Sequence, residues 1–286
     1  MPPLVSTDWL AFRLGLSDLV VVDASIVKMA KADGTYARRP AWLEFETSGH
    51  IPGARYADLI QDFSNPDSEF DFTRPGVRQM EAAAGALGFS ADSQIVVYDS
   101  ADGIWAARLW WLLRAFGHKN VSVLDGGLKK WVAENRPLAF GSALVRATTF
   151  RAQRRDGFFV DKADIVDVLD GRTTGHLVCV LRPAVFSGEE KVYSRVGHIP
   201  SSANLPYGDL VDDKTNALRS PEGLRASLAP LLEDGGRIIL YCGGGITAAG
   251  TALALAVLGI SNVAVYDGSL AEWTADQTLP LETGLS

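Results

Sequence analysis

Cysteine is scarce in this sequence, since the 286 residues include only Cys179 and Cys242. Two cysteines cannot build a disulfide framework or a cysteine-rich metal site. In a reducing compartment both remain free thiols. Each cysteine therefore has to be interpreted from the residues around it.

An excess of positive charge is also missing. The chain has 27 lysines and arginines against 34 aspartates and glutamates, which gives a formal net charge of -7. This balance offers no electrostatic footprint for nucleic acid or for an anionic membrane. No run reaches the roughly 18 apolar residues of a transmembrane helix, and the opening MPPLVSTDWLAF lacks the pattern of a signal peptide. We expect a cytoplasmic protein whose partners are small molecules or proteins, with no nucleic acid and no membrane among them.

What the sequence does contain is an internal repeat. Residues 96–131 and 239–273 both predict the order strand, loop, helix, strand, turn, helix, and both end in tryptophan. The tetrapeptide GHIP also occurs twice, at Gly49–Pro52 and at Gly197–Pro200. Such self-similarity indicates a duplicated structural unit.

The repeat and the chain length predict two domains of about 140 residues each. We expect homologous domains at 1–142 and 158–286, joined by an exposed linker at 143–157. Within each half, short β-branched runs such as IVVY and IILY alternate with longer helical patterns. This alternation predicts an α/β fold in which each domain is a parallel sheet flanked by helices on both faces.

Cys242 follows the strand-like run RIILY and precedes Gly243, Gly244 and Gly245, after which strong helix formers begin. In a parallel α/β sheet, ligands collect at the carboxyl ends of strands. Glycines let successive N–H groups turn inward around one atom, and the amino end of a helix adds about half a positive charge. The stretch predicts an anion cradle in which Cys242 reacts as a thiolate.

Three other positions indicate that Cys242 is the one reactive cysteine and that its loop is not that of a phosphatase. Cys179 lies inside the apolar run LVCV with no glycines behind it, so we interpret it as structural. Asp99 is the counterpart of Cys242 in the first half and cannot act as a thiol nucleophile, so we expect one catalytic half. A cysteine phosphatase would need an arginine at the close of the loop, where Ala248 stands.

These residues resemble the tandem-domain rhodanese superfamily, and within it the 3-mercaptopyruvate and thiosulfate sulfurtransferases. The resemblance covers nearly the whole chain and rests on the two GHIP segments, the closings LDGGLKKW and YDGSLAEW, and the loop YCGGGITA. It implies that Cys242 takes a sulfur atom from a donor as a persulfide and passes it to cyanide, a thiol or reduced thioredoxin. It implies no metal and no organic cofactor. The alternative is a noncatalytic rhodanese-like binding or regulatory module.

The resemblance also concerns the donor. Family members that favour thiosulfate carry basic residues directly after the cysteine, whereas CGGGITA resembles the small neutral loop of those that favour 3-mercaptopyruvate. Thr247 has a hydroxyl that could donate toward the sulfur or cap the helix. The substrate-binding residues implied by matching positions are Arg182, Gly243, Gly244, Gly245, Ile246 and Thr247, with Arg195 as a weaker candidate.

Two positions depart from the family pattern. Gly244 replaces a serine that belongs to a proposed proton relay with a histidine of the first domain. His50 matches that histidine and is a weak candidate for the site, although His198 repeats it in the second GHIP and a turn-stabilising role explains both more simply. Val180 replaces an aspartate that shortly precedes the substrate arginine. The first departure weakens the prediction of a mercaptopyruvate preference.

Overall fold

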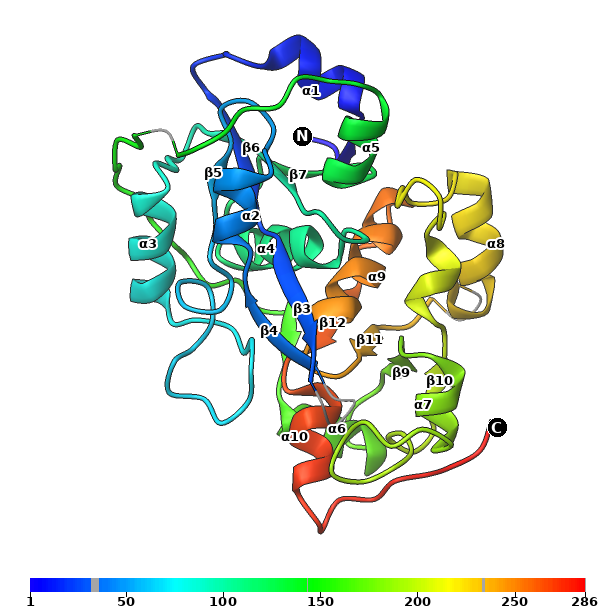
Figure 1. Ribbon diagram of the computed structural model, residues 1–286. Helices are drawn as coiled ribbons and strands as arrows, with labels where there is room; N and C mark the ends of the chain where they lie inside the picture. Colours follow the sequence, from blue (N-terminus) through cyan, green and yellow to red (C-terminus); the bar gives the residue numbers. More distant parts are fainter. Residues whose placement is uncertain (32–35, 143, 233–234, 286) are drawn as a thin grey trace. The chain divides into compact units, whose positions relative to one another are not determined.

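A computed structural model describes residues 1–31, 36–142, 144–232 and 235–285 (Figure 1). Residue 143, the first of the predicted linker, and residue 286 lie outside the described residues. The chain divides into two compact units, and each takes a short segment from the other half of the sequence. Unit 1 comprises Met1–Asp67, Arg74–Arg155 and Lys214–Ala217, and unit 2 comprises Ser68–Thr73, Asp156–Asp213 and Leu218–Ser286.

Unit 1 contains a five-stranded parallel sheet. The strands, in spatial order, are β1 (Leu4–Val5), β7 (Val121–Leu124), β6 (Gln94–Tyr98), β2 (Leu19–Asp23) and β5 (Arg55–Tyr56). The helices of this unit are α1 (Thr7–Arg13), α2 (Trp42–Thr47), α3 (Val77–Ala86), α4 (Ile104–Ala115) and α5 (Gly127–Ala133).

Unit 2 repeats this sheet. Its strands, in spatial order, are β10 (Ala203–Asn204), β9 (His176–Cys179), β11 (Ile238–Tyr241), β12 (Val263–Tyr266) and β8 (Phe159–Val160). The helices are α6 (Lys162–Leu169), α7 (Pro183–Ser187), α8 (Pro221–Leu232), α9 (Ile246–Val257) and α10 (Ser269–Ala275), with a 3₁₀ turn at Tyr207–Leu210. The predicted α/β fold of two homologous halves is confirmed.

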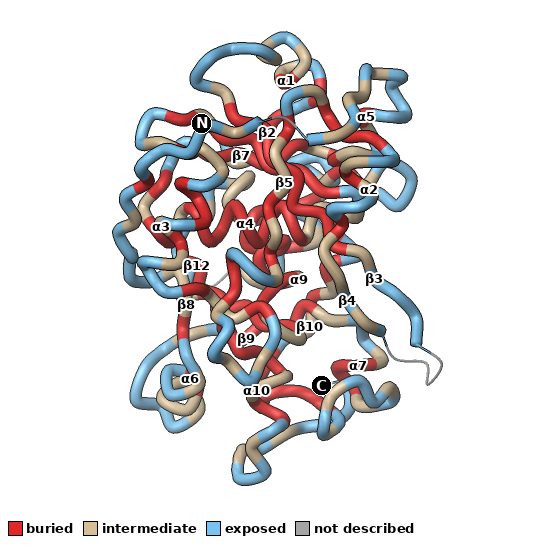
Figure 2. Tube along the Cα trace, turned by 60° about the vertical axis from the view of Figure 1, so that its left-hand side comes forward, coloured by how far each residue is buried: buried red, intermediate tan, exposed pale blue. Residues whose placement is uncertain are grey.

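Strands β7, β11 and β12 are buried along their whole length, and β2 and β6 are buried after their first residue (Figure 2). Successive side chains of a strand point to opposite faces of the sheet. In unit 2, Ile239 and Tyr241 of β11 pack in one hydrophobic cluster with residues of α6, α7 and α10. Helix α9 packs against β11 and β12, and α8 packs against α9. Because both faces of the strand are covered, the run IILY has to be apolar throughout.

Fine details of packing are duplicated as well. Trp131 and Trp273, which close the two repeats, are both fully buried. The indole N–H of Trp131 donates to the carbonyl of Pro137 at 2.8 Å, and that of Trp273 donates to Pro280 at 2.9 Å. The tryptophans therefore fix the chain that leaves the last helix of each repeat.

A hairpin in unit 1 is absent from the predictions made above. Its strands β3 (Ile26–Ala30) and β4 (Tyr36–Pro40) pair antiparallel, outside the two parallel sheets. Ile26 is buried, whereas most of the remaining residues of the hairpin are half-buried or exposed. Strands in which apolar and polar residues do not alternate regularly give a weak signal in the sequence.

Candidate active site

Cys242 directly follows β11, a central strand that pairs with β9 and β12. It is 2% exposed, while Gly243 and Gly244 are half-buried. Helix α9 begins at Ile246, and Gly245 forms its N-cap with φ of +73°. Cys242 therefore lies at the carboxyl end of a central strand and at the amino end of a helix, as the sequence predicts.

Ser269 bridges the two ends of the loop that holds Cys242. This serine is fully buried, and its Oγ accepts the backbone N–H of Cys242 at 3.1 Å and of Gly245 at 3.2 Å. The same hydroxyl donates to the carbonyl oxygen of Tyr266 at 2.8 Å. One side chain thus fixes the width of the loop.

The start of α10 fastens the loop from the same side. The N–H of Leu270 donates to the carbonyl of Cys242 at 3.0 Å, and the N–H of Ala271 donates to the carbonyl of Gly243 at 2.9 Å. These bonds use N–H groups that the first turn of a helix cannot satisfy internally. The loop is held by α10, while its other side faces the amino end of α9.

Sequence reasoning missed Ser269, although a signal was present. The equivalent residue in the first repeat is Gly127, with φ of +52°, and a Cβ there would lie 2.4 Å from the carbonyl oxygen of Asp99. Ser269 has φ of +50°, a left-handed conformation that costs a serine energy. A serine at a position suited to glycine, in the cysteine-bearing repeat, indicates that its hydroxyl is needed.

In unit 1 a carboxylate occupies the equivalent cradle. Asp99 is fully buried at the end of β6. Its Oδ1 accepts the N–H groups of Ala101 at 2.9 Å and Gly103 at 3.1 Å. Its Oδ2 accepts those of Trp105 at 3.0 Å and Ala106 at 2.9 Å. The first turn of α4 therefore holds an anion at the end of the preceding strand.

The same helix geometry recurs at α9. Gly103 and Gly245 are both left-handed N-caps, each followed by a 12-residue helix. The offset of 142 residues that relates Trp131 to Trp273 makes Thr247 and Ala248 the counterparts of the two first-turn donors. Thr247 is half-buried inside the first turn, so the prediction that it caps α9 is wrong: the N-cap is Gly245.

Gly244 has room for a side chain. A Cβ at this position would have one neighbour within 4 Å among the described residues, the carbonyl oxygen of Asp71 at 3.5 Å. Asp71 lies on the segment Ser68–Thr73, which belongs to unit 2. A distance of 3.5 Å is an ordinary van der Waals contact, so the Cβ of a side chain is not excluded by space.

Arg182 emerges from the strand next to that of the cysteine. The N–H of Val180, just after β9, donates to the carbonyl of Tyr241 at 3.0 Å. Arg182 follows two residues later as the N-cap of α7. Its side chain is 70% exposed and pairs with Glu190 at 2.9 Å. Both Arg182 and Cys242 thus follow the carboxyl ends of adjacent parallel strands.

Arg195 is committed to the end of α10. Its guanidinium donates to four backbone carbonyls, those of Trp273, Thr274, Asp276 and Leu279, at distances from 2.6 to 3.2 Å. Cations favour the carboxyl end of a helix, where carbonyl groups lack partners. The expectation that Arg195 contacts the sulfur donor is therefore wrong, because its guanidinium is bonded to the end of α10.

The two GHIP histidines make matching contacts with a phenylalanine of the preceding helix. His50 is 3% exposed, stacks on Phe45 at 3.9 Å and places Nδ1 2.9 Å from the carbonyl oxygen of Phe45. His198 is 1% exposed and makes the same two contacts with Phe186, at 3.6 and 2.8 Å. These contacts support the turn-stabilising interpretation for both residues.

Cys179 is a core residue. It is fully buried in the same hydrophobic cluster as Tyr241. Burial raises the pKa of the Cys179 thiol to about 12, so this cysteine stays protonated at neutral pH. The structural interpretation of Cys179 is confirmed.

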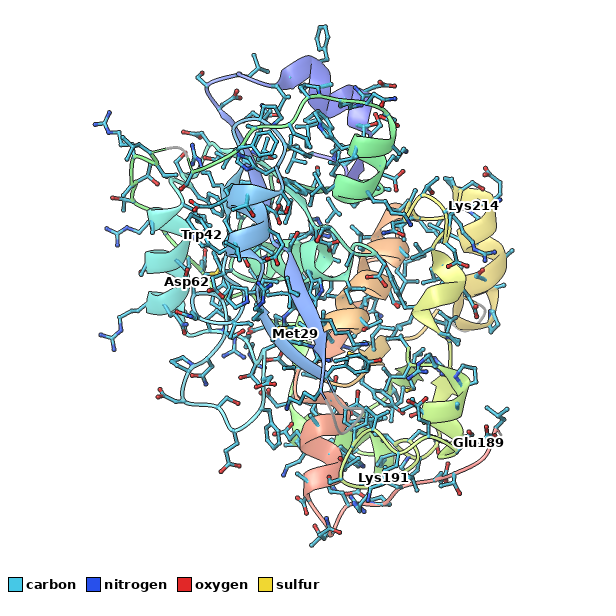
Figure 3. The ribbon with its side chains drawn as sticks, in the orientation of Figure 1. Met29, Trp42, Asp62, Glu189, Lys191 and Lys214 are labelled. Carbon is cyan, nitrogen blue, oxygen red and sulfur yellow. The ribbon has the colours of Figure 1, made fainter. Side chains whose placement is uncertain are left out.

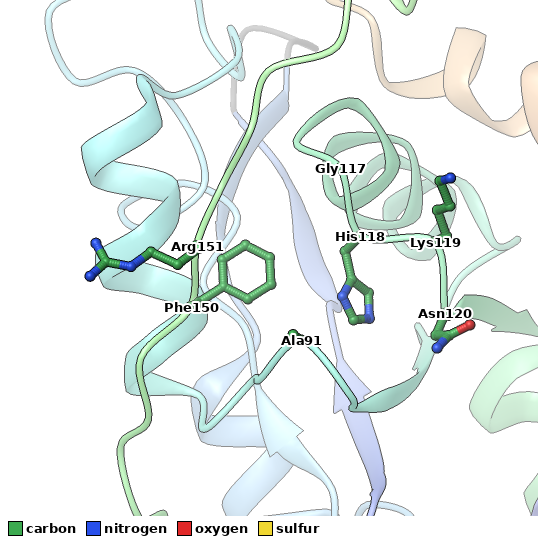
Figure 4. Close-up of a pocket in the computed structure, with 7 residues that line it drawn as sticks. All are labelled: Ala91, Gly117, His118, Lys119, Asn120, Phe150 and Arg151. Carbon is green, nitrogen blue, oxygen red and sulfur yellow. The ribbon is translucent and has the colours of Figure 1, made fainter.

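Unit 1 contains a pocket that includes no residue of the cysteine loop. It has a volume of about 260 Å³, and its lining includes His118, Lys119, Phe150 and Arg151 (Figure 4). The Nε2 of His118 lies 3.0 Å from the carbonyl oxygen of Ser93, and burial lowers the pKa of this histidine. A neutral, backbone-bound histidine offers no reactive group here.

In the part of the chain that the structure describes, no three histidine, cysteine or acidic side chains are grouped so that they could hold a metal ion. Among the same residues, no helix combines the length and apolarity needed to cross a membrane.

Comparison with known proteins identifies the family. The model of the rhodanese-like domain matches residues 7–134 and 160–276, which together make up most of the sequence. The chain belongs to the rhodanese family. As a tandem rhodanese, it is 36% identical to 3-mercaptopyruvate sulfurtransferase from Homo sapiens, over 94% of this chain and 91% of that protein. It is 33% identical to thiosulfate sulfurtransferase from Mus musculus, over 99% and 95%.

A solved rhodanese structure agrees with these similarities. The crystal structure of SseA from Escherichia coli, described as a 3-mercaptopyruvate sulfotransferase, matches with a TM-score of 0.82 and 30% identity, over 94% of this chain and 99% of that one. Full-length homology of this kind makes the tandem rhodanese a sulfurtransferase, an enzyme with a sulfur donor and a sulfur acceptor. The alternative of a noncatalytic module is therefore set aside.

For this rhodanese, replacing Ser269 by alanine is expected to lower both the melting temperature and sulfur transfer. The change leaves the buried N–H groups of Cys242 and Gly245 without this acceptor, at a cost of about 1 to 3 kcal/mol each. Thermal unfolding and steady-state turnover measure the two effects. Ser269→Gly is the matched variant, because it also removes the hydroxyl but accepts the left-handed backbone. Wild-type turnover in both variants would contradict a positioning role.

Proposed function

We propose that the enzyme moves a sulfane sulfur from 3-mercaptopyruvate or thiosulfate to a thiophilic acceptor through a persulfide on Cys242. The observation that carries this proposal is the carboxylate of Asp99, held by four N–H groups in the duplicated loop of unit 1. In unit 2 the residue at the equivalent strand end, shortly before the helix start, is a cysteine instead. A cradle that holds a carboxylate in one copy is suited to a thiolate or a persulfide anion in the other.

The proposed reaction has two steps. The Cys242 thiolate attacks the donor sulfur, and a sulfur–sulfur bond forms while the bond from that sulfur to the rest of the donor breaks. The leaving group takes the bonding electron pair: 3-mercaptopyruvate leaves as the pyruvate enolate, which then gains a proton, and thiosulfate leaves as sulfite. An acceptor nucleophile next attacks the outer sulfur and restores the thiolate. No oxidant, metal or organic cofactor is required.

We assign the donor carboxylate to Arg182. This arginine follows the strand next to that of Cys242 and is largely exposed. Its ion pair with Glu190 is a surface pair, which is worth little and can be exchanged for a substrate carboxylate. The loop itself offers N–H groups from Gly243, Gly244 and Ile246 but no cationic side chain. A neutral loop with one arginine nearby favours 3-mercaptopyruvate over the doubly charged thiosulfate.

The acceptor has to reach a cysteine that is only 2% exposed. Cyanide and small thiols meet this condition by size, and reduced thioredoxin would do so if its reactive thiol approaches past the half-buried Gly243 and Gly244. The cycle needs Cys242 as a free thiol, and both cysteines are free. We therefore propose a reducing compartment such as the cytoplasm.

Intact-protein mass spectrometry tests the proposal. The reduced enzyme is exposed briefly to 3-mercaptopyruvate or to thiosulfate, and a mass gain of one sulfur atom is expected. Half-maximal loading of Arg182→Ala should need at least about tenfold more 3-mercaptopyruvate, because a charge-assisted contact is lost. Absence of added sulfur with either donor would overturn the persulfide mechanism. An unchanged requirement in Arg182→Ala would remove that residue from the donor site.

A further inference from the structure

The residue after the nucleophile is a glycine for a reason that lies outside the loop. The φ of Gly243 is not in the left-handed region, so its backbone conformation is open to other residues. A Cβ at this position would nevertheless lie 1.9 Å from the hydroxyl oxygen of Tyr193 and 2.8 Å from its Cζ. A side chain at position 243 would therefore have to displace the ring of Tyr193.

The chain that follows Tyr193 is anchored to α10. Tyr193 lies on the segment that follows α7, which also carries the exposed Glu189 and Lys191 (Figure 3). Its ring packs against the hydrophobic cluster of unit 2. The next residue, Ser194, donates its hydroxyl to Thr274 Oγ1 of α10 at 2.9 Å. A shift of the backbone at Tyr193 would therefore disturb the helix that fastens the loop.

Arg195 completes this anchor. Its four bonds to the carbonyl groups at the end of α10 fix the residue two positions after Tyr193. The start of α10 in turn bonds the carbonyl groups of Cys242 and Gly243. One helix therefore positions both the loop and the segment that covers it. This gives Arg195 a role in the site that does not require contact with substrate.

We propose that Tyr193 determines donor specificity by keeping the position after Cys242 free of a cationic side chain. The proposal rests on the proposed function of Cys242. With the hydroxyl of Tyr193 in that space, the position next to the nucleophile carries no cationic side chain. A dianion in a largely buried site needs more than one compensating charge, whereas a carboxylate monoanion is matched by a single arginine. The substrate class selected is an organic thiol that bears one carboxylate.

The test combines substitutions at the two positions. Gly243→Arg alone is expected to lower the melting temperature, because its Cβ displaces Tyr193. Tyr193→Ala together with Gly243→Arg should regain the melting temperature of Tyr193→Ala, since the space is then open. In this double variant, the ratio of kcat/KM for thiosulfate to that for 3-mercaptopyruvate should rise at least about tenfold over the wild type, as expected for one new charge-assisted contact.

A control variant and three outcomes separate the parts of the proposal. Gly244→Ala is the matched control for folding and should keep the wild-type melting temperature, because its Cβ has room. If Gly243→Arg melts like Gly244→Ala, Tyr193 does not exclude a side chain. If the double variant takes up sulfur but keeps the wild-type donor ratio, the specificity role is overturned. If no protein, including the wild type, takes up sulfur, the proposed function itself fails. The melting temperatures still test whether Tyr193 clashes with a side chain at position 243.

Discussion

Cys242→Ser is expected to reduce turnover with either donor at least about 1,000-fold, because the covalent intermediate can no longer form. A serine hydroxyl at this position is uncharged at neutral pH and does not attack a sulfur atom. The variant should fold normally, since it keeps the backbone bonds that Ser269 and α10 make with the loop. Steady-state kinetics and the mass of the donor-treated protein measure the loss.

Cys179→Ala is the matched control for this experiment. Cys179 is fully buried, and its raised pKa of about 12 keeps it protonated. Its removal should lower the melting temperature through a small cavity but leave the mass gain of one sulfur intact. Turnover by Cys242→Ser, or loss of sulfur loading in a folded Cys179→Ala protein, would show that the nucleophile has been assigned to the wrong cysteine.

A second large effect is expected on stability, at Asp99 of unit 1. Asp99→Asn replaces one carboxylate oxygen by an NH₂ group, which faces N–H donors in a cradle built for an acceptor. With two buried N–H groups left unsatisfied, the free energy of unfolding should fall by about 3 kcal/mol. Denaturant unfolding near neutral pH measures it. Asp92→Asn, at an exposed position of the same unit, is the control and should change stability little.

The same residue predicts a pH dependence. Burial raises the pKa of Asp99 from its ordinary value of 3.8 to about 6, although its N–H partners oppose this shift. Between these two values the folded chain binds more protons than the unfolded chain, so the contribution of Asp99 to stability falls as the pH rises through this range. Above about pH 6 the loss is complete. The stability of the wild type relative to Asp99→Asn should therefore decrease from about pH 4 to pH 6, and an increase would contradict the assignment.

The fold could be predicted because its signals are local. Each buried strand is a continuous apolar run, and the duplication repeats those runs in the same order. The hairpin of β3 and β4 could not be predicted, since its residues are mostly outside the core and its apolar residues do not alternate regularly with polar ones. The loop Cys242–Gly245 could be predicted for the same reason as the sheets: its residues are contiguous and precede a helix.

Residues that act on the loop from elsewhere were missed, and among them Ser269 left a signal only in the comparison of the two repeats, as a serine where the first repeat has Gly127. Ser269 is 27 residues from Cys242, and Tyr193 is further away, so the fold alone brings them to the loop. Arg195 lies beside a GHIP segment and suggests a substrate contact, but its partners begin 78 residues away at the end of α10. For each of these residues, function depends on tertiary neighbours that no local pattern encodes.

The carboxylate of Asp99 has a consequence for motion. The loop that contains Asp99 in unit 1 is bonded to this carboxylate at all times, so its conformation does not depend on catalysis. The loop of Cys242 gains its anion only when the thiolate or the persulfide is present, and no described carboxylate is bonded to the amide groups of Thr247 and Ala248 as Asp99 is in unit 1. The duplicated loops should therefore differ in conformational entropy: one is rigid throughout the cycle, and the other tightens and relaxes with each sulfur atom that passes.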